Sequence, residues 1–162
     1  MKKLIFLSTF YLCSQFSYAQ NPTFSVKEID SIVKRIDSTC ISGGITDYNF
    51  HKKGNKKKVI GGGADWFYTD TSSTKLLKAI RETSLNTENL DSYYFYQDSL
   101  IYLTISNRTY IDGKKVINWQ GQYYFQNGRL IFKHDNLKFL FDPKTYFETA
   151  RRFFKAGEIW RR

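Results

Sequence analysis

Residues 93–102 read YYFYQDSLIY and residues 123–132 read YYFQNGRLIF, so one pattern recurs 30 positions along the chain. The two stretches align without a gap and share Tyr, Tyr, Phe, Leu and Ile at matching positions. Aromatic and β-branched residues on either side of a polar centre are typical of two strands joined by a turn. In the second copy the turn is Asn127-Gly128, the strongest short signal for a two-residue hairpin. Two copies are too few for a repeat architecture, so we expect successive hairpins of one antiparallel sheet.

The region around the two hairpins predicts further strands. Between residues 45 and 136 short apolar runs alternate with turn residues, among them Asp112-Gly113. This pattern predicts an antiparallel β-meander of about six or seven strands. Residues 75–82 fit a strand or a short helix, and we favour a strand. The run Gly61-Gly62-Gly63 interrupts a strand-like segment and predicts a β-bulge or a sharp bend.

A helix is predicted before the sheet. Ser25 and Glu28 have the spacing of a capping box, in which each residue satisfies a backbone amide of the other. Apolar residues then recur every three or four positions from Val26 to Cys40 and form a single stripe. Gly43-Gly44 is the expected end of this helix.

A second helix is predicted after the sheet. Asp142 suits a helix N-cap, Pro143 suits the first helical position, and Gly157 suits a helix end. The elements together predict an α+β fold, with the N-terminal and the C-terminal helix packed on one face of the meander. Regular alternation from the Asn127-Gly128 turn assigns to that face Trp119, Tyr123, Phe125, Leu130 and Phe132.

The opposite face of the second hairpin is polar with an aromatic residue at its centre. A tyrosine ring flanked by amide and cationic side chains can stack on a sugar ring and hold its hydroxyl groups. The plain alternative is a set of ordinary cross-strand surface pairs. The candidate binding residues on this face are Tyr124, Gln120, Gln122, Arg129 and Lys133.

The first 19 residues have the layout of a secretory signal peptide. Lys2 and Lys3 precede an apolar run of ten residues, and Ser17 and Ala19 supply the small residues of a cleavage site. A buried N-terminal helix is the alternative. The prediction is a signal peptide over 1–19, a single domain over 20–162, and a periplasmic or secreted protein with no transmembrane segment after cleavage. Cleavage lowers the net charge from +10 to +8 and leaves Cys40 as the only cysteine, which we expect to be buried.

The motifs of common catalytic and cofactor sites are absent from the sequence. Gly61-Gly62-Gly63 is followed by Ala64-Asp65 and not by the Lys-Ser/Thr of a phosphate loop, and no HExxH or paired CxxC occurs. We therefore expect no cofactor, no metal centre and no catalytic residues. His134 reads as a residue at a strand end. Scattered carboxylates leave open a hydrolase that uses two of them; they include Asp65, Asp70, Asp91 and Asp112.

Two clusters of basic residues are candidates for contact with an anion. The first is formed by Lys52, Lys53, Lys56, Lys57 and Lys58, and the second by Arg151, Arg152, Lys155, Arg161 and Arg162. Such clusters attract anions over a distance that salt shortens, although a solubilising surface is the plain alternative. The partners considered are an anionic glycan, a lipid headgroup and an acidic protein. Nucleic acid is disfavoured by export and by the lack of an RNA-binding signature.

These observations favour a small exported protein that binds a partner or contacts the cell envelope and has no evident catalytic site. Two alternatives stay open: a carboxylate-based hydrolase that acts on a glycan, and a structural assembly component of the envelope. The leader followed by a hairpin meander is similar to the layout of small secreted bacterial proteins.

Overall fold

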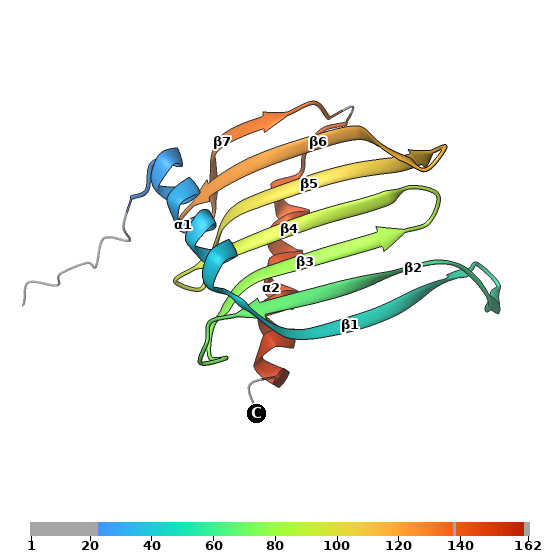
Figure 1. The fold of residues 1–162 in the computed structure, drawn as a ribbon, viewed down its shortest axis with the longest axis horizontal. Helices are drawn as coiled ribbons and strands as arrows, with labels where there is room; N and C mark the ends of the chain where they lie inside the picture. The colour runs from blue at the N-terminus through green and yellow to red at the C-terminus, as the bar shows by residue number, and fades with distance from the viewer. Residues whose placement is uncertain (1–22, 138, 161–162) are drawn as a thin grey trace, which may run out of the picture.

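The computed structural model describes residues 23–137 and 139–160, and the predicted signal peptide lies outside them. In this part of the chain seven strands form one antiparallel sheet, and each strand lies beside its sequence neighbours (Figure 1). One helix lies near each terminus, so the predicted α+β meander is confirmed. The elements in chain order are α1 (Val26–Thr39), β1 (Ile41–Lys52), β2 (Asn55–Thr69), β3 (Leu76–Ser84), β4 (Glu88–Tyr96), β5 (Ser99–Ile111), β6 (Lys114–Gln126), β7 (Arg129–Asp135) and α2 (Pro143–Trp160).

The two helices lie on opposite faces of the sheet, so the prediction that both pack on one face is wrong. Figure 1 shows α1 in front of the strands and α2 behind them. The buried sheet residues in the α1 cluster are Tyr94, Ile101, Tyr102 and Tyr124. The α2 cluster is larger, and its buried aromatic residues on the sheet are Phe67, Tyr93, Phe95, Tyr123 and Phe125. Adjacent residues of a strand point to opposite faces, so each Tyr-Tyr pair of the repeat supplies one ring to each helix.

A β-bulge beside each repeated turn explains why the predicted faces were partly wrong. Asn127 and Gly128 have φ values of 49° and 71°, and Gln97 and Asp98 have 48° and 58°, as a type I′ turn requires. Just beyond each turn the register shifts by one residue. Phe132 therefore pairs with Tyr124 instead of Tyr123, and its side chain lies on the α1 face.

The capping box predicted for the first helix is present. The Ser25 amide donates to Glu28 Oε2 at 2.7 Å, and the Glu28 amide donates to Ser25 Oγ at 3.4 Å. The helix ends at Thr39, earlier than predicted, because Cys40 takes an extended conformation that leads directly into β1. Gly43-Gly44 consequently lies within β1. The free Cys40 is half-buried, less enclosed than expected.

Two aspartates attach α1 to the sheet. The Tyr124 hydroxyl donates to Asp30 Oδ1 at 2.9 Å, and the Tyr94 hydroxyl donates to Asp37 at 3.2 Å. Lys78 pairs with the same Asp37 at 2.7 Å. These polar bonds fix the position of the helix over an apolar contact that consists mainly of Ile29, Ile32 and Ile36.

The second helix starts where the sequence predicts and ends later. Asp142 accepts the Lys144 amide at 3.1 Å and the Thr145 hydroxyl at 2.7 Å, as an N-cap does. The helix runs on to Trp160 and does not stop at Gly157. Its Phe153 ring contacts Phe67 and Tyr93 edge-on, at centroid distances of 5.7 and 5.0 Å.

The glycine run of β2 permits a close approach between strands. A Cβ on Gly63 would lie 2.4 Å from the Glu82 carbonyl oxygen and 2.8 Å from the Tyr48 ring. A register shift next to Gly61 confirms the predicted irregularity. Residues 76–84 form strand β3, as favoured from the sequence.

The helices leave one end of the sheet uncovered, at the right in Figure 1. Three connections reach this end: the β1–β2 hairpin, the β3–β4 loop and the β5–β6 hairpin. We define the free end as residues 51–60, 84–88 and 108–117. The opposite end, where the repeated turns lie, is the part that α1 covers.

Candidate functional site

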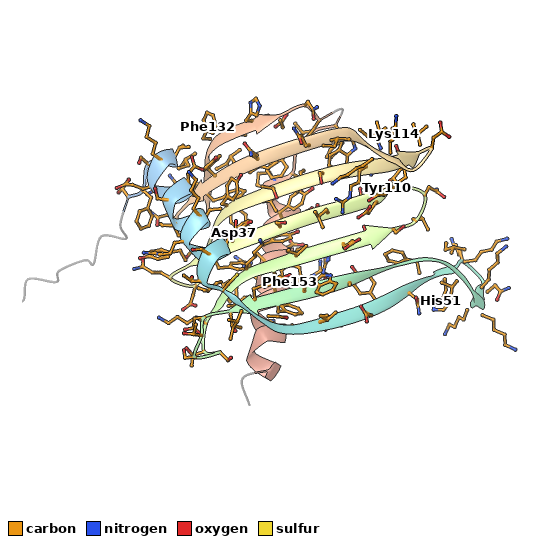
Figure 2. The ribbon with its side chains drawn as sticks, viewed as in Figure 1. Asp37, His51, Tyr110, Lys114, Phe132 and Phe153 are labelled. Atoms are coloured by element: carbon orange, nitrogen blue, oxygen red, sulfur yellow. The ribbon has the colours of Figure 1, made fainter. Side chains whose placement is uncertain are left out.

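The free end is strongly basic. It contains seven exposed lysines: Lys52, Lys53, Lys56, Lys57, Lys58, Lys114 and Lys115. With Arg108 these outnumber the two acids of the same segments, Glu88 and Asp112, by six charges. Figure 2 shows Lys114 of the β5–β6 hairpin and His51 of the β1–β2 hairpin at the same end of the molecule. The structure therefore adds Lys114 and Lys115 to the first cluster predicted from the sequence.

The second predicted basic cluster lies elsewhere. Arg151, Arg152 and Lys155 are exposed on α2, which covers the other face of the sheet away from the free end. Arg152 also donates to the Thr149 hydroxyl at 3.0 Å. Arg161 and Arg162 lie outside the described residues. Arg151, Arg152 and Lys155 thus form a surface separate from the free end.

Exposed apolar side chains accompany the lysines. Between about two fifths and three fifths of the surface of each is accessible to solvent, with Tyr110 at 61% and Ile60 at 42%. Isolated exposed apolar residues are ordinary, but a group at one end of a molecule indicates a contact surface. The group contains Val59, Ile60, Leu85, Tyr110, Ile111, Val116 and Ile117.

Two adjoining hollows lie at the free end on the face that carries α1. The first has a volume of about 540 Å³, a floor that includes Gly62 and Ala64, and walls that include Ile60 and Leu85. The second has a volume of about 520 Å³ and includes Tyr110. Both contain Glu82 and Ser84, so they form one open trough across β2, β3, β4 and β5.

A carboxyl pair and an arginine occupy the trough. Arg108 forms an ion pair with Glu88, and Glu88 shares a hydrogen bond with Glu82. Burial raises the pKa of Glu82, and the hydrogen bond to Glu88 raises it further. Burial opposes ionisation of Glu88 as well, but the hydrogen bonds with Arg108 and Glu82 outweigh it and lower the pKa of Glu88. Arg108 and Glu88 neutralise each other, so the surplus positive charge of the free end comes from its lysines.

The structure divides the residues predicted to bind a sugar. Tyr124 is only 6% exposed because α1 covers it, which rules out the predicted open stacking surface. Arg129 is exposed beside the Asn127-Gly128 turn, and Lys133 lies on the α2 side of β7, where it pairs with Asp135 at 3.3 Å. The sequence error follows from not knowing which face α1 covers.

Gln120 and Gln122 do come together in a hollow. It has a volume of about 430 Å³, and Thr104, Ser106 and His134 line it with them. His134 and the neighbouring Asp135 point to opposite faces of β7, as predicted, because Asp135 contacts Tyr123 and Lys133 on the other side. This hollow is neutral and polar, unlike the free end.

A charged row that sequence inspection missed lies on the α2 face. Arg81 donates to both carboxylate oxygens of Asp65 at 2.8 Å, and Asp91 is the cross-strand partner of Arg81 on β4. Burial raises the pKa of Asp91 to about 7; Asp65 adds to the effect and Arg81 opposes it. Asp65, Arg81 and Asp91 lie far apart in the sequence, on three different strands. Only the pairing of those strands brings them into one row.

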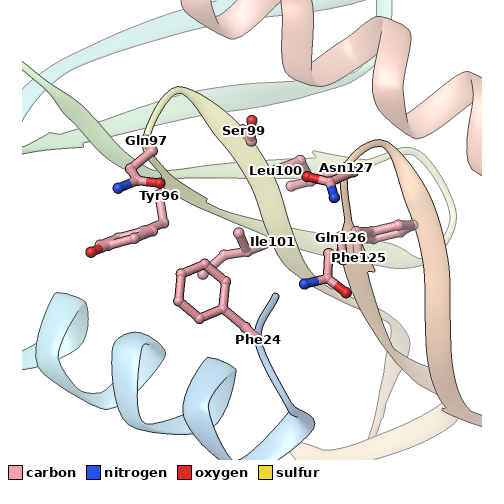
Figure 3. Close-up of a pocket in the computed structure, with 9 residues that line it drawn as sticks. All are labelled: Phe24, Tyr96, Gln97, Ser99, Leu100, Ile101, Phe125, Gln126 and Asn127. Carbon is pink, nitrogen blue, oxygen red and sulfur yellow. The ribbon is translucent and has the colours of Figure 1, made fainter. Parts of the chain in front are cut away.

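A small cavity lies at the covered end, beneath Phe24 and between the two repeated turns (Figure 3). Its volume is about 70 Å³, and Tyr96, Gln97 and Asn127 contribute to its wall. That volume admits a few water molecules, so the cavity is a gap in the packing around the N-terminus of α1.

No family model, no curated protein and no solved structure matches this chain. Within residues 23–137 and 139–160, neither helix has the length and apolar character that crossing a membrane requires. In the same residues no three His, Cys, Asp or Glu side chains gather as metal ligands would.

Proposed function

We propose that the chain is an exported, non-enzymatic binding protein whose free end contacts an anionic partner. The observation that supports this proposal is the surplus of six positive charges at an end of the sheet that neither helix covers. Ammonium groups on projecting hairpins can reach an anion from several directions at once. Their field raises the local concentration of anions and weakens as salt is added.

The carboxyl groups give little support to the hydrolase alternative. Glu82 and Glu88 share a hydrogen bond, whereas glycoside hydrolysis places its two carboxyls about 5 Å or more apart. Asp65 is held by Arg81, Asp70 accepts hydrogen bonds from Thr74 and Lys75 in the β2–β3 loop, and Asp112 lies in a hairpin turn. Structural contacts thus account for two of the four aspartates considered for catalysis, and a turn position accounts for a third.

The proposal is tested with a soluble polyanion such as dextran sulfate and a variant with two reversed charges, Lys57→Glu with Lys115→Glu. A matched control, Arg151→Glu with Lys155→Glu, makes the same change in net charge on α2. We expect the free-end variant to bind at least tenfold more weakly and the control to keep most of its affinity. Equal losses in both variants, or no binding of the natural sequence at low salt, would refute the proposal.

A further inference from the structure

Four of the seven exposed apolar side chains of the free end lie on one face of the sheet. Arg108 pairs with both Glu88 and Ile117, and Tyr110 pairs with Lys115. Cross-strand partners share a face, so Ile117 and Tyr110 lie on the side that carries α1. Ile60 and Leu85 border the trough on that same side. The four side chains are between 42% and 61% exposed.

Lysines surround this apolar group. Lys115 is the partner of Tyr110, and Lys57 and Lys58 precede Val59 and Ile60 on β2. A lysine stem can lie along apolar surface while its ammonium group reaches outward to a charged one. Tyr110 has a similar division, with an apolar ring and a polar hydroxyl group, and such side chains suit the boundary between lipid and water.

An acidic polymer would contact the lysines of this surface but not its apolar side chains. A polysaccharide or an acidic protein region offers anions to the lysines but leaves the exposed apolar side chains in water. The interface of an anionic bilayer offers phosphate groups and, a few ångströms deeper, acyl chains that remove apolar side chains from water. Both features of the free end are then satisfied by one partner.

We infer that the partner of the free end is the surface of an anionic lipid bilayer, an inference that rests on the function proposed above. The β1–β2 and β5–β6 hairpins project at the same end of the sheet (Figure 2). In the proposed complex both hairpins therefore face the bilayer. The trough between Ile60 and Leu85 enlarges the apolar area available to lipid. Because α1 covers the other end of the same face, the bound molecule lies with its free end toward the bilayer.

The test measures sedimentation of the full chain with phosphatidylcholine vesicles that contain either no phosphatidylglycerol or about one third of it. We expect binding only to the anionic vesicles. Each lysine near such a surface contributes about fivefold in affinity, so Lys57→Glu with Lys115→Glu should weaken binding to both vesicles and dextran sulfate at least tenfold. The α2 control, Arg151→Glu with Lys155→Glu, should retain both.

A second variant separates the two proposals. Ile60→Ser with Ile117→Ser removes apolar surface and leaves every charge in place. We expect it to bind dextran sulfate as the natural sequence does and anionic vesicles about tenfold more weakly. Unchanged circular dichroism and thermal unfolding would show that the fold is intact. Because both residues are exposed, the substitutions should not disturb the core.

The possible outcomes separate the lipid inference from the proposed function. Unchanged vesicle binding by the apolar variant, or polyanion binding without vesicle binding, would overturn the lipid inference and leave the proposed function standing. Failure to bind either probe would overturn both. As a direct readout, a tryptophan at position 110 (Tyr110→Trp) should be quenched by vesicles with brominated acyl chains if the free end enters the interface. A lack of quenching in a bound sample would also refute the inference.

Discussion

Asp91 shows how the sheet places a charge where water is scarce. It lies on β4 between Arg81 and Ile105, on the face that α2 covers, and most of its carboxyl is enclosed. Burial is the main reason why the pKa of Asp91 rises to about 7. Arg81 already donates twice to Asp65, so its attraction for Asp91 offsets burial only in part.

The pKa of Asp91 predicts the pH dependence of stability. A carboxyl has a pKa near 4 in the unfolded chain, so the folded state is favoured by protonated Asp91 at low pH. This contribution is lost as the pH rises from about 4 through 7. Asp91→Asn should therefore raise the free energy of unfolding by about 1–3 kcal/mol at pH 8 and change it little at pH 4, as measured by urea titration.

Asp65→Asn is the contrasting substitution. It removes the carboxylate that Arg81 binds and leaves a half-buried guanidinium with a weaker partner, so we expect a loss of about 2 kcal/mol at pH 8. If both substitutions destabilise the protein at pH 8, the Asp91 carboxylate has a partner that the geometry does not provide.

Tyr124 provides a second prediction at the level of single residues. Its hydroxyl donates to Asp30 and helps to hold α1 on the sheet. Tyr124→Phe should reduce the free energy of unfolding by about 1 kcal/mol and leave partner binding unchanged. Denaturant unfolding and the dextran sulfate assay measure the two effects. A binding defect at unchanged stability would contradict this purely structural role.

At the level of elements, the repeated hairpin offers an internal comparison. Both copies form type I′ turns, yet the first places Gln97 and Asp98 at positive φ, where the second has Asn127 and Gly128. Left-handed backbone costs most residues about 1 kcal/mol and costs glycine almost nothing.

Transfer of the second turn into the first hairpin should therefore stabilise the protein. Gln97→Asn with Asp98→Gly is expected to raise the free energy of unfolding by about 1 kcal/mol, as measured from the shift of the urea midpoint at constant slope. The reverse transfer, Asn127→Gln with Gly128→Asp, should lower it by a similar amount. A loss of stability in the first variant would show that Gln97 or Asp98 makes a contact worth more than the backbone strain.

The same hairpins show which features of the fold could be predicted from the sequence. The strands, the Asn127-Gly128 turn and the capping box at Ser25 are local features with local signals, and all were predicted. The bulge beside each turn has no signature residue, and a shift of one position moves a side chain to the other face. Phe132 was therefore assigned to the wrong face. Placing Tyr124 required knowing that α1 packs on that side, which depends on contacts with residues far away in the sequence.

Only part of the candidate site could be predicted from the sequence. The five lysines of the β1–β2 hairpin form a run that is visible in the sequence. Lys114 and Lys115 join them only because an antiparallel meander brings alternate connections to the same end of the sheet. No local pattern shows which end the helices leave uncovered, so the exposed apolar side chains around those lysines could not be recognised from the sequence.

At the scale of the whole molecule, an open sheet has two edges that could pair with other copies. Natural sheets protect such edges with bulges, short strands and charge. β1 has several register shifts along its pairing with β2 and ends in the lysine hairpin, while β7 has seven residues and a shift of its own. The shared positive charge of the hairpins opposes contact between identical free ends, so we regard charge as part of this protection.

Removal of that charge should promote self-association without loss of the fold. Replacement of the five hairpin lysines by glutamine (Lys52, Lys53, Lys56, Lys57 and Lys58) removes repulsion from an exposed hairpin and should leave the thermal midpoint unchanged or slightly higher. Sedimentation velocity should then detect oligomers at concentrations where the natural sequence is monomeric, because the apolar side chains beside the hairpin are no longer kept apart. High salt should produce the same shift in the natural sequence by screening its charges. The control Arg151→Gln with Lys155→Gln should stay monomeric, and a monomeric hairpin variant would show that the edges of the sheet are protected by their shape alone.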